Sequence, residues 1–107
     1  MNKIIYVMHR REDITHNEFL REWSSERHVS LVQAVPGLTR YVQNLVVPDP
    51  EQGEPFCDGV AELWFESAEA VPQALQSEEV AVALEHAQSF LDFDRTGMVV
   101  VNEKDAV

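Results

Sequence analysis

His28 is the side chain in this sequence best suited to moving a proton. It follows Trp23 in a stretch with apolar residues at helical spacing and precedes Leu31 and Val32, so we expect it at the edge of an apolar helix face. An imidazole, with an ordinary pKa near 6.5, can act as a general acid or base at neutral pH. The plainer alternative is a histidine that only borders the core and bonds to a carbonyl.

Two carboxylates, Asp58 and Glu62, lie four residues apart in an apolar segment that reads as a strand. At about 3.3 Å per residue their side chains share one face of the strand, about 13 Å apart. They are too far apart to share a proton, but either could orient a histidine brought over the sheet. The alternative is an exposed sheet edge, or a salt bridge to Arg40 or Arg95.

Tyr41 and Gln43 alternate onto one face of another predicted strand. A tyrosine hydroxyl and a side-chain amide could polarise a substrate carbonyl, as oxyanion-stabilising groups do. A packed ring with a solvated hydroxyl is the alternative for Tyr41.

Other chemistries have little support. No two histidines are four residues apart, and no set of cysteines lies near them, so we expect no structural metal site. Cys57 is the only cysteine and forms no intrachain disulfide. No glycine-rich phosphate motif occurs, and we expect no cofactor. A single haem-ligating histidine stays open as an alternative.

The elements that must position these residues follow from periodicity. A capping box from Thr15 to Glu18 begins a helix that we expect to run to Pro36-Gly37. Pro72 is expected near the first helical position of a later turn, and a second helix follows Ser77 and closes at Phe90 and Leu91. Strands are predicted at residues 3–10, 38–47, 56–65 and 98–102, with a loose tail after them.

This order, β-α-β-β-α-β, predicts a single α+β domain over residues 1–107 with a ferredoxin-like antiparallel sheet. Both helices then cover one face of the sheet. On the third strand, Asp58, Val60, Glu62 and Trp64 point toward the other face. Because this face includes apolar side chains, we do not expect it to be fully exposed to solvent. We therefore expect a homodimer.

The net charge of the chain limits the kinds of partner that we expect it to bind. The formal net charge is −11, from 19 acidic and 8 basic residues, which disfavours nucleic acid and anionic membrane surfaces. No signal peptide and no membrane-length apolar segment is evident, so we expect a cytoplasmic protein.

The runs FLREWSSERHVSLV, PGLTRYVQNLVVPD and FCDGVAELWFES, with the strand order, resemble the EthD family of the dimeric α/β-barrel superfamily over nearly the whole chain. The residues of this chain that match the family pattern are Trp23, His28, Tyr41, Asp58, Glu62 and Trp64. Ser30 and Pro72 depart from this pattern. It implies a protomer whose sheet packs on a partner's sheet, with a pocket between each protomer's own sheet and helices.

The resemblance also suggests a function, because relatives in the wider superfamily include cofactor-free monooxygenases, lactone isomerases and polyketide cyclases. We expect a small enzyme of oxidoreductase, isomerase or cyclase type acting on a compact, apolar oxygenated molecule. His28 would move a proton, Asp58 or Glu62 would orient it, and Tyr41 would polarise an oxygen. Gln43 would assist in binding, and Trp23 and Trp64 would exclude water. The alternative is a non-catalytic accessory protein of an oxidative catabolic pathway that binds the same ligand.

Overall fold

The computed structural model describes residues 2–107 and contains one antiparallel sheet of four strands in the order β2-β3-β1-β4. The strands are β1 (Asn2–Met8), β2 (Leu38–Leu45), β3 (Gly59–Phe65) and β4 (Gly97–Val101). β1 and β3 lie at the centre, and every neighbouring pair is antiparallel. The predicted ferredoxin-like α+β fold is confirmed.

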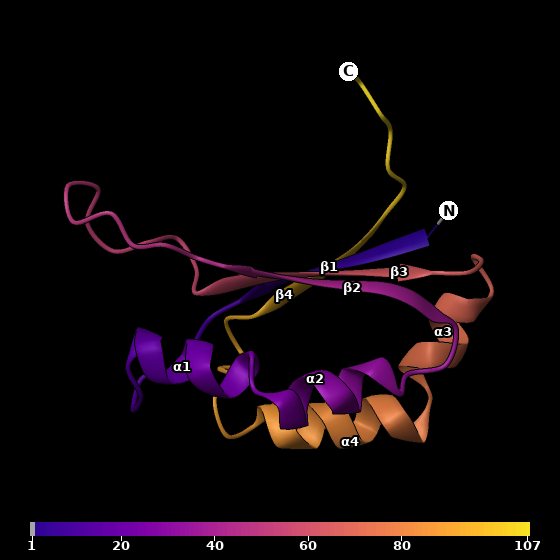
Figure 1. Ribbon diagram of the computed structural model, residues 1–107, viewed down its shortest axis with the longest axis horizontal. Coiled ribbons are helices and arrows are strands. Elements are labelled where there is room, and N and C mark those ends of the chain that lie inside the picture. The colour runs from indigo at the N-terminus through magenta and orange to yellow at the C-terminus, as the bar shows by residue number, and fades with distance from the viewer. Residues whose placement is uncertain (1) are drawn as a thin grey trace.

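All helices lie on one face of this sheet (Figure 1). They are α1 (His16–Trp23), α2 (Glu26–Gln33), α3 (Ala70–Leu75) and α4 (Glu78–Ala87). No helix within residues 2–107 has the length and apolar character needed to cross a membrane. The layers are therefore a sheet with one covered face and a second face from which the C-terminal tail rises, while the β2–β3 loop extends beyond one end of the sheet (Figure 1).

The first helical segment is interrupted, contrary to the prediction of one helix from Thr15 to Pro36-Gly37. The capping box at Thr15 is present, but α1 ends at Trp23. The Ser25 side chain then accepts a hydrogen bond from the His28 backbone N–H and begins α2. A serine at this position competes for backbone donors and favours a new helix start over continuation.

The second helical segment also consists of two helices. Pro72 occupies the third position of α3, not the first as expected, and it lies within the first turn, where a proline removes no helical hydrogen bond. Ser77 caps α4 by accepting from the Val80 N–H. α4 packs beside α2, so the helices nearest the sheet centre form a pair.

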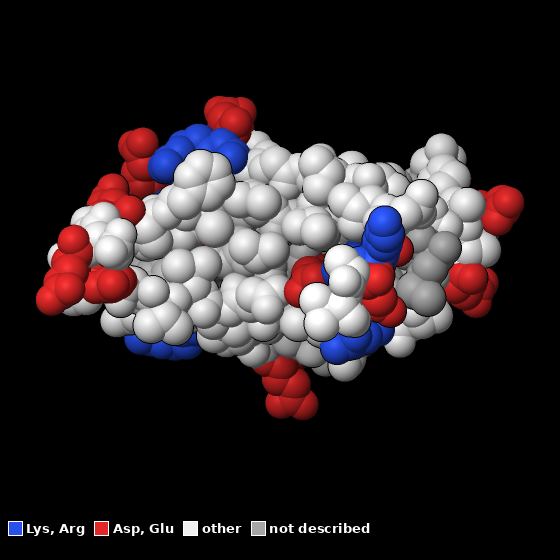
Figure 2. Space-filling view, turned by 90° about the horizontal axis from the view of Figure 1, so that it is seen from above, with Lys and Arg blue, Asp and Glu red and all other residues white. Residues whose placement is uncertain are grey.

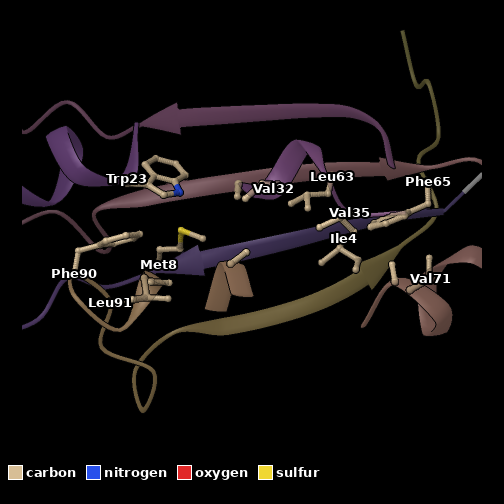
Figure 3. Close-up of a cluster of buried hydrophobic side chains, with 14 of the residues drawn as sticks. Ile4, Met8, Trp23, Val32, Val35, Leu63, Phe65, Val71, Phe90 and Leu91 are labelled. Carbon is tan, nitrogen blue, oxygen red and sulfur yellow. The ribbon is translucent and has the colours of Figure 1, made fainter. Parts of the chain in front are cut away.

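The core lies between the sheet and the helices (Figure 3). Its largest fully buried side chains are Trp23, Phe19, Phe90 and Ile4. Trp23 packs against Gly59 so closely that a Cβ on this glycine would lie 2.6 Å from the indole ring. Trp23 is thus a core residue, held where β3 begins, and the absence of a side chain at Gly59 makes room for it.

The opposite face of the sheet is apolar in its middle, with charges toward two ends (Figure 2). The row Val42, Glu62, Ile5 and Val99 crosses all four strands, and Val99 is 53% exposed. In the next row Trp64 lies between Arg40 and Lys3, with each cation above its ring. Glu103 of the tail accepts a hydrogen bond from the Trp64 indole, so the tail is not loose throughout.

Candidate functional site

A cavity of about 340 Å³ lies between the covered face of the sheet and helices α2 and α4. Its walls are mostly aliphatic, and they include Val32, Leu63, Val80, Ala83, Leu84 and Met98. This volume is at the lower end of the range for small-molecule pockets, so it suits a compact, largely apolar ligand. The polar lining residues are His28, Tyr41, Tyr6 and Thr96.

His28 lies in the first turn of α2 and lines this cavity. Its side chain is buried, with 4% of the residue exposed, and its ring meets the edge of Phe90. Burial, with a smaller contribution from the charge of His86, lowers the pKa of His28 from 6.5 to about 4. His28 is therefore neutral at physiological pH and can accept a proton from a ligand in the cavity.

The hydrogen-bond partner of His28 is a second histidine. His28 Nδ1 lies 3.0 Å from His86 Nδ1, and the two rings are roughly parallel, 28° apart with centroids 5.2 Å apart. One of these nitrogens must carry the proton that the other accepts. His86 was not among the residues expected at the site, although it stands near Ala83 and Ala87 of the apolar stripe in α4.

Tyr41 reaches the cavity from β2, and Gln43 holds its hydroxyl. Gln43 Nε2 donates to the Tyr41 oxygen at 2.9 Å and to the Trp23 carbonyl at 2.8 Å. Burial raises the pKa of Tyr41 to about 12, against a smaller opposing effect of the Gln43 hydrogen bond. The phenol stays protonated, and because its oxygen already accepts from Gln43, its proton is free for a ligand oxygen.

Tyr6 and Thr96 add two hydroxyls to the same cavity. Burial raises the pKa of Tyr6, so this phenol also stays protonated. Neither residue was singled out from the sequence, since a tyrosine and a threonine next to strands fit ordinary packing. Only the pairing of β1 with β4, which sets Tyr6 opposite Met98, brings both to the cavity wall.

Asp58 does not contact His28, and the prediction that it orients this histidine is wrong. One Asp58 oxygen lies 2.6 Å from His16 Nδ1, and the other accepts from the Arg10 backbone N–H at 2.9 Å. His16 Nε2 lies 2.9 Å from the Val46 carbonyl oxygen. Asp58 thus joins α1 to the ends of β1 and β3, outside the cavity.

Glu62 does not contact His28 either, because it lies on the opposite face of the sheet. It pairs with Lys3 Nζ at 2.5 Å and accepts a hydrogen bond from Asn44. The hydrogen bond with Lys3 lowers the pKa of Glu62. Trp64 shares this face and is absent from the cavity wall. Trp23 does not line the cavity either, but its carbonyl accepts a hydrogen bond from Gln43.

Metal-binding residues do not cluster in the part of the chain that the structure describes. Across residues 2–107, no group of three or more His, Cys, Asp or Glu side chains is placed to hold an ion. The Trp23 indole N–H is fully buried and has no hydrogen-bond partner in the same range.

The fold and the cavity define a class: ferredoxin-like α+β proteins with a cavity between sheet and helices. The EthD domain family matches residues 11–94, which is most of the chain. The protein belongs to the EthD family. No curated protein matches this sequence.

Solved structures agree with this assignment. An ethyl tert-butyl ether D (EthD) family protein from Bacillus halodurans is 22% identical, with a TM-score of 0.78 over 97% of this chain and 99% of that one. A dimeric protein of ferredoxin-like fold from Bacteroides fragilis is 15% identical, with a TM-score of 0.71 over 95% of each chain. SnoaB, a cofactor-independent oxygenase from Streptomyces nogalater, is 10% identical with a TM-score of 0.68, covering 99% of this chain and 95% of that one. At these identities the likeness concerns the fold.

Proposed function

We propose that this protein is a small homodimeric enzyme that performs acid–base chemistry with His28 on a compact, largely apolar, oxygenated molecule. The observation that carries the proposal is the pairing of a buried, neutral imidazole with a protonated phenol in one aliphatic cavity. A lactone, a phenol or a polyketide fragment has the size and polarity that the cavity suits.

The chemistry follows from the protonation states. His28 accepts a proton from an acidic C–H or O–H of the ligand, and Tyr41 donates a hydrogen bond to the ligand oxygen on which negative charge develops. His28 is a weak base, with a pKa of about 4. The ligand anion formed in the cavity stabilises the imidazolium beside it, because charges attract strongly where water is excluded.

The reaction type is oxidoreductase, isomerase or cyclase, since each can begin with this proton abstraction. SnoaB, which shares the fold, is a cofactor-independent oxygenase, and this supports an oxidative reaction without a bound cofactor. A carbanion or phenolate formed in a dry cavity is the common starting point for such chemistry.

The homodimer is part of the proposal. Val42, Ile5 and Val99 are the apolar members of a row on the uncovered sheet face that also contains Glu62, paired with Lys3. Figure 2 shows the middle of this face to be largely uncharged. Sheet-to-sheet packing with a second copy would bury this row. The Bacteroides fragilis protein of the same fold is described as dimeric, which favours the same assembly here.

A non-catalytic accessory protein is the second candidate, and one observation favours it. The hydrogen-bond partner of His28 is an imidazole, and within residues 2–107 no carboxylate contacts its ring. In catalytic triads a carboxylate fixes the tautomer of the base and stabilises its charged form. An accessory protein would need the cavity but not the proton transfer.

The test is an exchange assay that needs no knowledge of the complete reaction. The protein is incubated in D₂O with a panel of lactones, phenols and β-dicarbonyl compounds, and loss of each acidic C–H signal is followed by NMR. We expect enzyme-dependent exchange for at least one compound, with His28→Gln slowing it about 100-fold or more. Tyr41→Phe should slow exchange and weaken binding, and Gln88→Ala, an exposed change after α4, is the matched control.

The same panel separates the two candidates. Ligand binding, seen as chemical-shift changes in the protein, without any exchange would support the accessory protein and contradict the enzyme. Exchange that persists in His28→Gln with the fold intact would also remove His28 from the mechanism.

A further inference from the structure

We propose that His28 and His86 form a proton relay that connects the cavity to a groove on the outer surface of α2 and α4. This inference rests on the proposed function, because it assigns a route for the proton that His28 removes from the ligand. It gives a role to a histidine for which the acid–base step alone has none.

The geometry places the two histidines between two separate spaces. His28 lines the cavity, whereas His86 lines a surface groove formed with Glu22, Arg27, Leu31, Val82, Glu85 and Ser89. The exposed fractions agree, since His28 is buried and His86 is partly exposed. The 3.0 Å contact between their Nδ1 atoms is the bridge between the spaces.

Each imidazole has one nitrogen that the other histidine does not engage, that of His28 for the cavity and that of His86 for the groove. With Nδ1 of His28 engaged by His86, Nε2 is the nitrogen left to meet a ligand. With Nδ1 of His86 engaged by His28, Nε2 of His86 is left for solvent in the groove. Phe90 packs its ring against both imidazoles, with centroids 5.1 Å from His28 and 5.8 Å from His86, and holds them in this arrangement.

The proton transfers balance without a net charge on the pair. His28 Nε2 takes the ligand proton, His28 Nδ1 passes its proton to His86 Nδ1, and His86 Nε2 releases one to water. Both imidazoles are neutral before and after, and only their tautomers have changed. This avoids a lasting imidazolium at a buried position, which desolvation makes costly.

The groove supplies charges of both signs around the outer end of the relay. Glu22 of α1 and Glu85 of α4 are acidic, and Arg27 of α2 is basic. These side chains are exposed, so solvent reaches the groove and can take up or return the proton. A return path is needed for an isomerase or cyclase, which gives back the proton it removes.

The first experiment uses the protein without any ligand. Long-range ¹H–¹⁵N NMR of the ¹⁵N-labelled chain at neutral pH reports the tautomer of each imidazole. We expect His28 and His86 to interchange tautomers, with Nδ1 shifts between those of protonated and bare nitrogens, and His86→Phe to fix the tautomer of His28. Two rings held in single, independent tautomers would overturn the relay, whether or not the protein is an enzyme.

The second experiment uses the exchange assay with a compound that the wild type turns over. We expect His86→Phe, which keeps an aromatic ring beside Phe90, to slow exchange about 10-fold while the dissociation constant of the compound stays unchanged. In His86→Ala, added imidazole should restore the rate by entering the groove, whereas His28→Ala should not respond in this way. Gln88→Ala again serves as control.

These outcomes distinguish the relay from the acid–base proposal. Loss of exchange in His28→Gln with full exchange in His86→Phe would overturn the relay and leave the proposed function standing. Exchange in no compound at all would remove the proposed function, and the tautomer measurement would then decide whether the pair shares a proton. Weaker ligand binding in His86→Phe at an unchanged rate of exchange would make His86 a packing residue and overturn its role in the relay.

Discussion

His16 Nδ1 lies 2.6 Å from an oxygen of the Asp58 carboxylate, at the end of the sheet where α1 begins. The same carboxylate accepts from the Arg10 backbone N–H, and the Arg10 guanidinium is 3.7 Å away. Asp58 is 9% exposed, so it is a nearly buried acceptor whose partners come from two segments, the connection after β1 and the first turn of α1. Its contacts indicate a structural role.

Replacement of Asp58 by Asn should lower the free energy of unfolding by about 1–3 kcal/mol, because a buried group loses charged hydrogen bonds that nothing replaces. Urea unfolding followed by circular dichroism measures the change. The matched control is Asp13→Asn, whose pair with Arg11 is exposed to solvent and should contribute much less to stability. Equal effects in the two variants would contradict the structural role of Asp58.

Stability should fall as the pH drops from 6.5 to about 4, with His28 as one cause. The unfolded chain binds a proton on His28 below pH 6.5, but the folded protein binds it only near pH 4. Between these values the unfolded state binds more protons, so acid favours unfolding by up to about 3 kcal/mol.

The measurement is the free energy of unfolding of the wild type and His28→Gln at several pH values. The stability curve of the wild type should descend more steeply between pH 6.5 and 4 than that of the variant, and the two should run parallel below pH 4. Curves that are parallel over the whole range would show that the pKa of His28 is not depressed by folding.

Val99→Lys should break the proposed homodimer, because it sets an unpaired charge next to Ile5 on the apolar part of the uncovered sheet face. Light scattering after gel filtration should change from a dimeric to a monomeric mass. Val82→Lys is the control, since Val82 is 43% exposed on the helical side of the molecule and should leave the mass unchanged. A wild type that is already monomeric would refute the dimer directly.

Gly59→Ala should destabilise the protein by about 1–3 kcal/mol through overpacking. The added Cβ would lie 2.6 Å from the Trp23 ring, which is fully buried and cannot retreat into solvent. Thermal unfolding and the Trp fluorescence spectrum report the loss. Gly97→Ala, where a Cβ meets nothing within 4 Å, is the control, and a similar loss there would contradict the packing explanation.

The strand pattern and two of the four helix starts were readable from the sequence because they depend on local signals. Alternation predicted the four strands to within about three residues, and Thr15 and Ser77 mark helix starts as expected. The break at Ser25 was missed because the apolar spacing continues through it, from Trp23 to Val32. A cap inside a periodic stretch is visible only when the hydrogen bond of the serine is known.

The site was predictable only in part, because strand alternation tells which residues share a face but not what covers it. His28 and Tyr41 both line the cavity, as the resemblance implied. Glu62 faces away from the helices, and its pairing with Lys3 depends on the register of β1 against β3. His86 contacts His28 only because α4 packs on α2. The two histidines are 58 residues apart in the sequence, so local patterns do not reveal this contact.

Because α1 and α2 are separated at Ser24 and Ser25, His28 lies on a helix whose start does not depend on the length of α1. Because each residue of a helix turns the chain by about 100°, a residue added or lost within one unbroken helix would swing His28 away from the cavity. Here the orientation of His28 is reset by the cap three residues before it. Changes in the length or the charge of α1 therefore leave the orientation of the His28 imidazole toward the cavity unchanged.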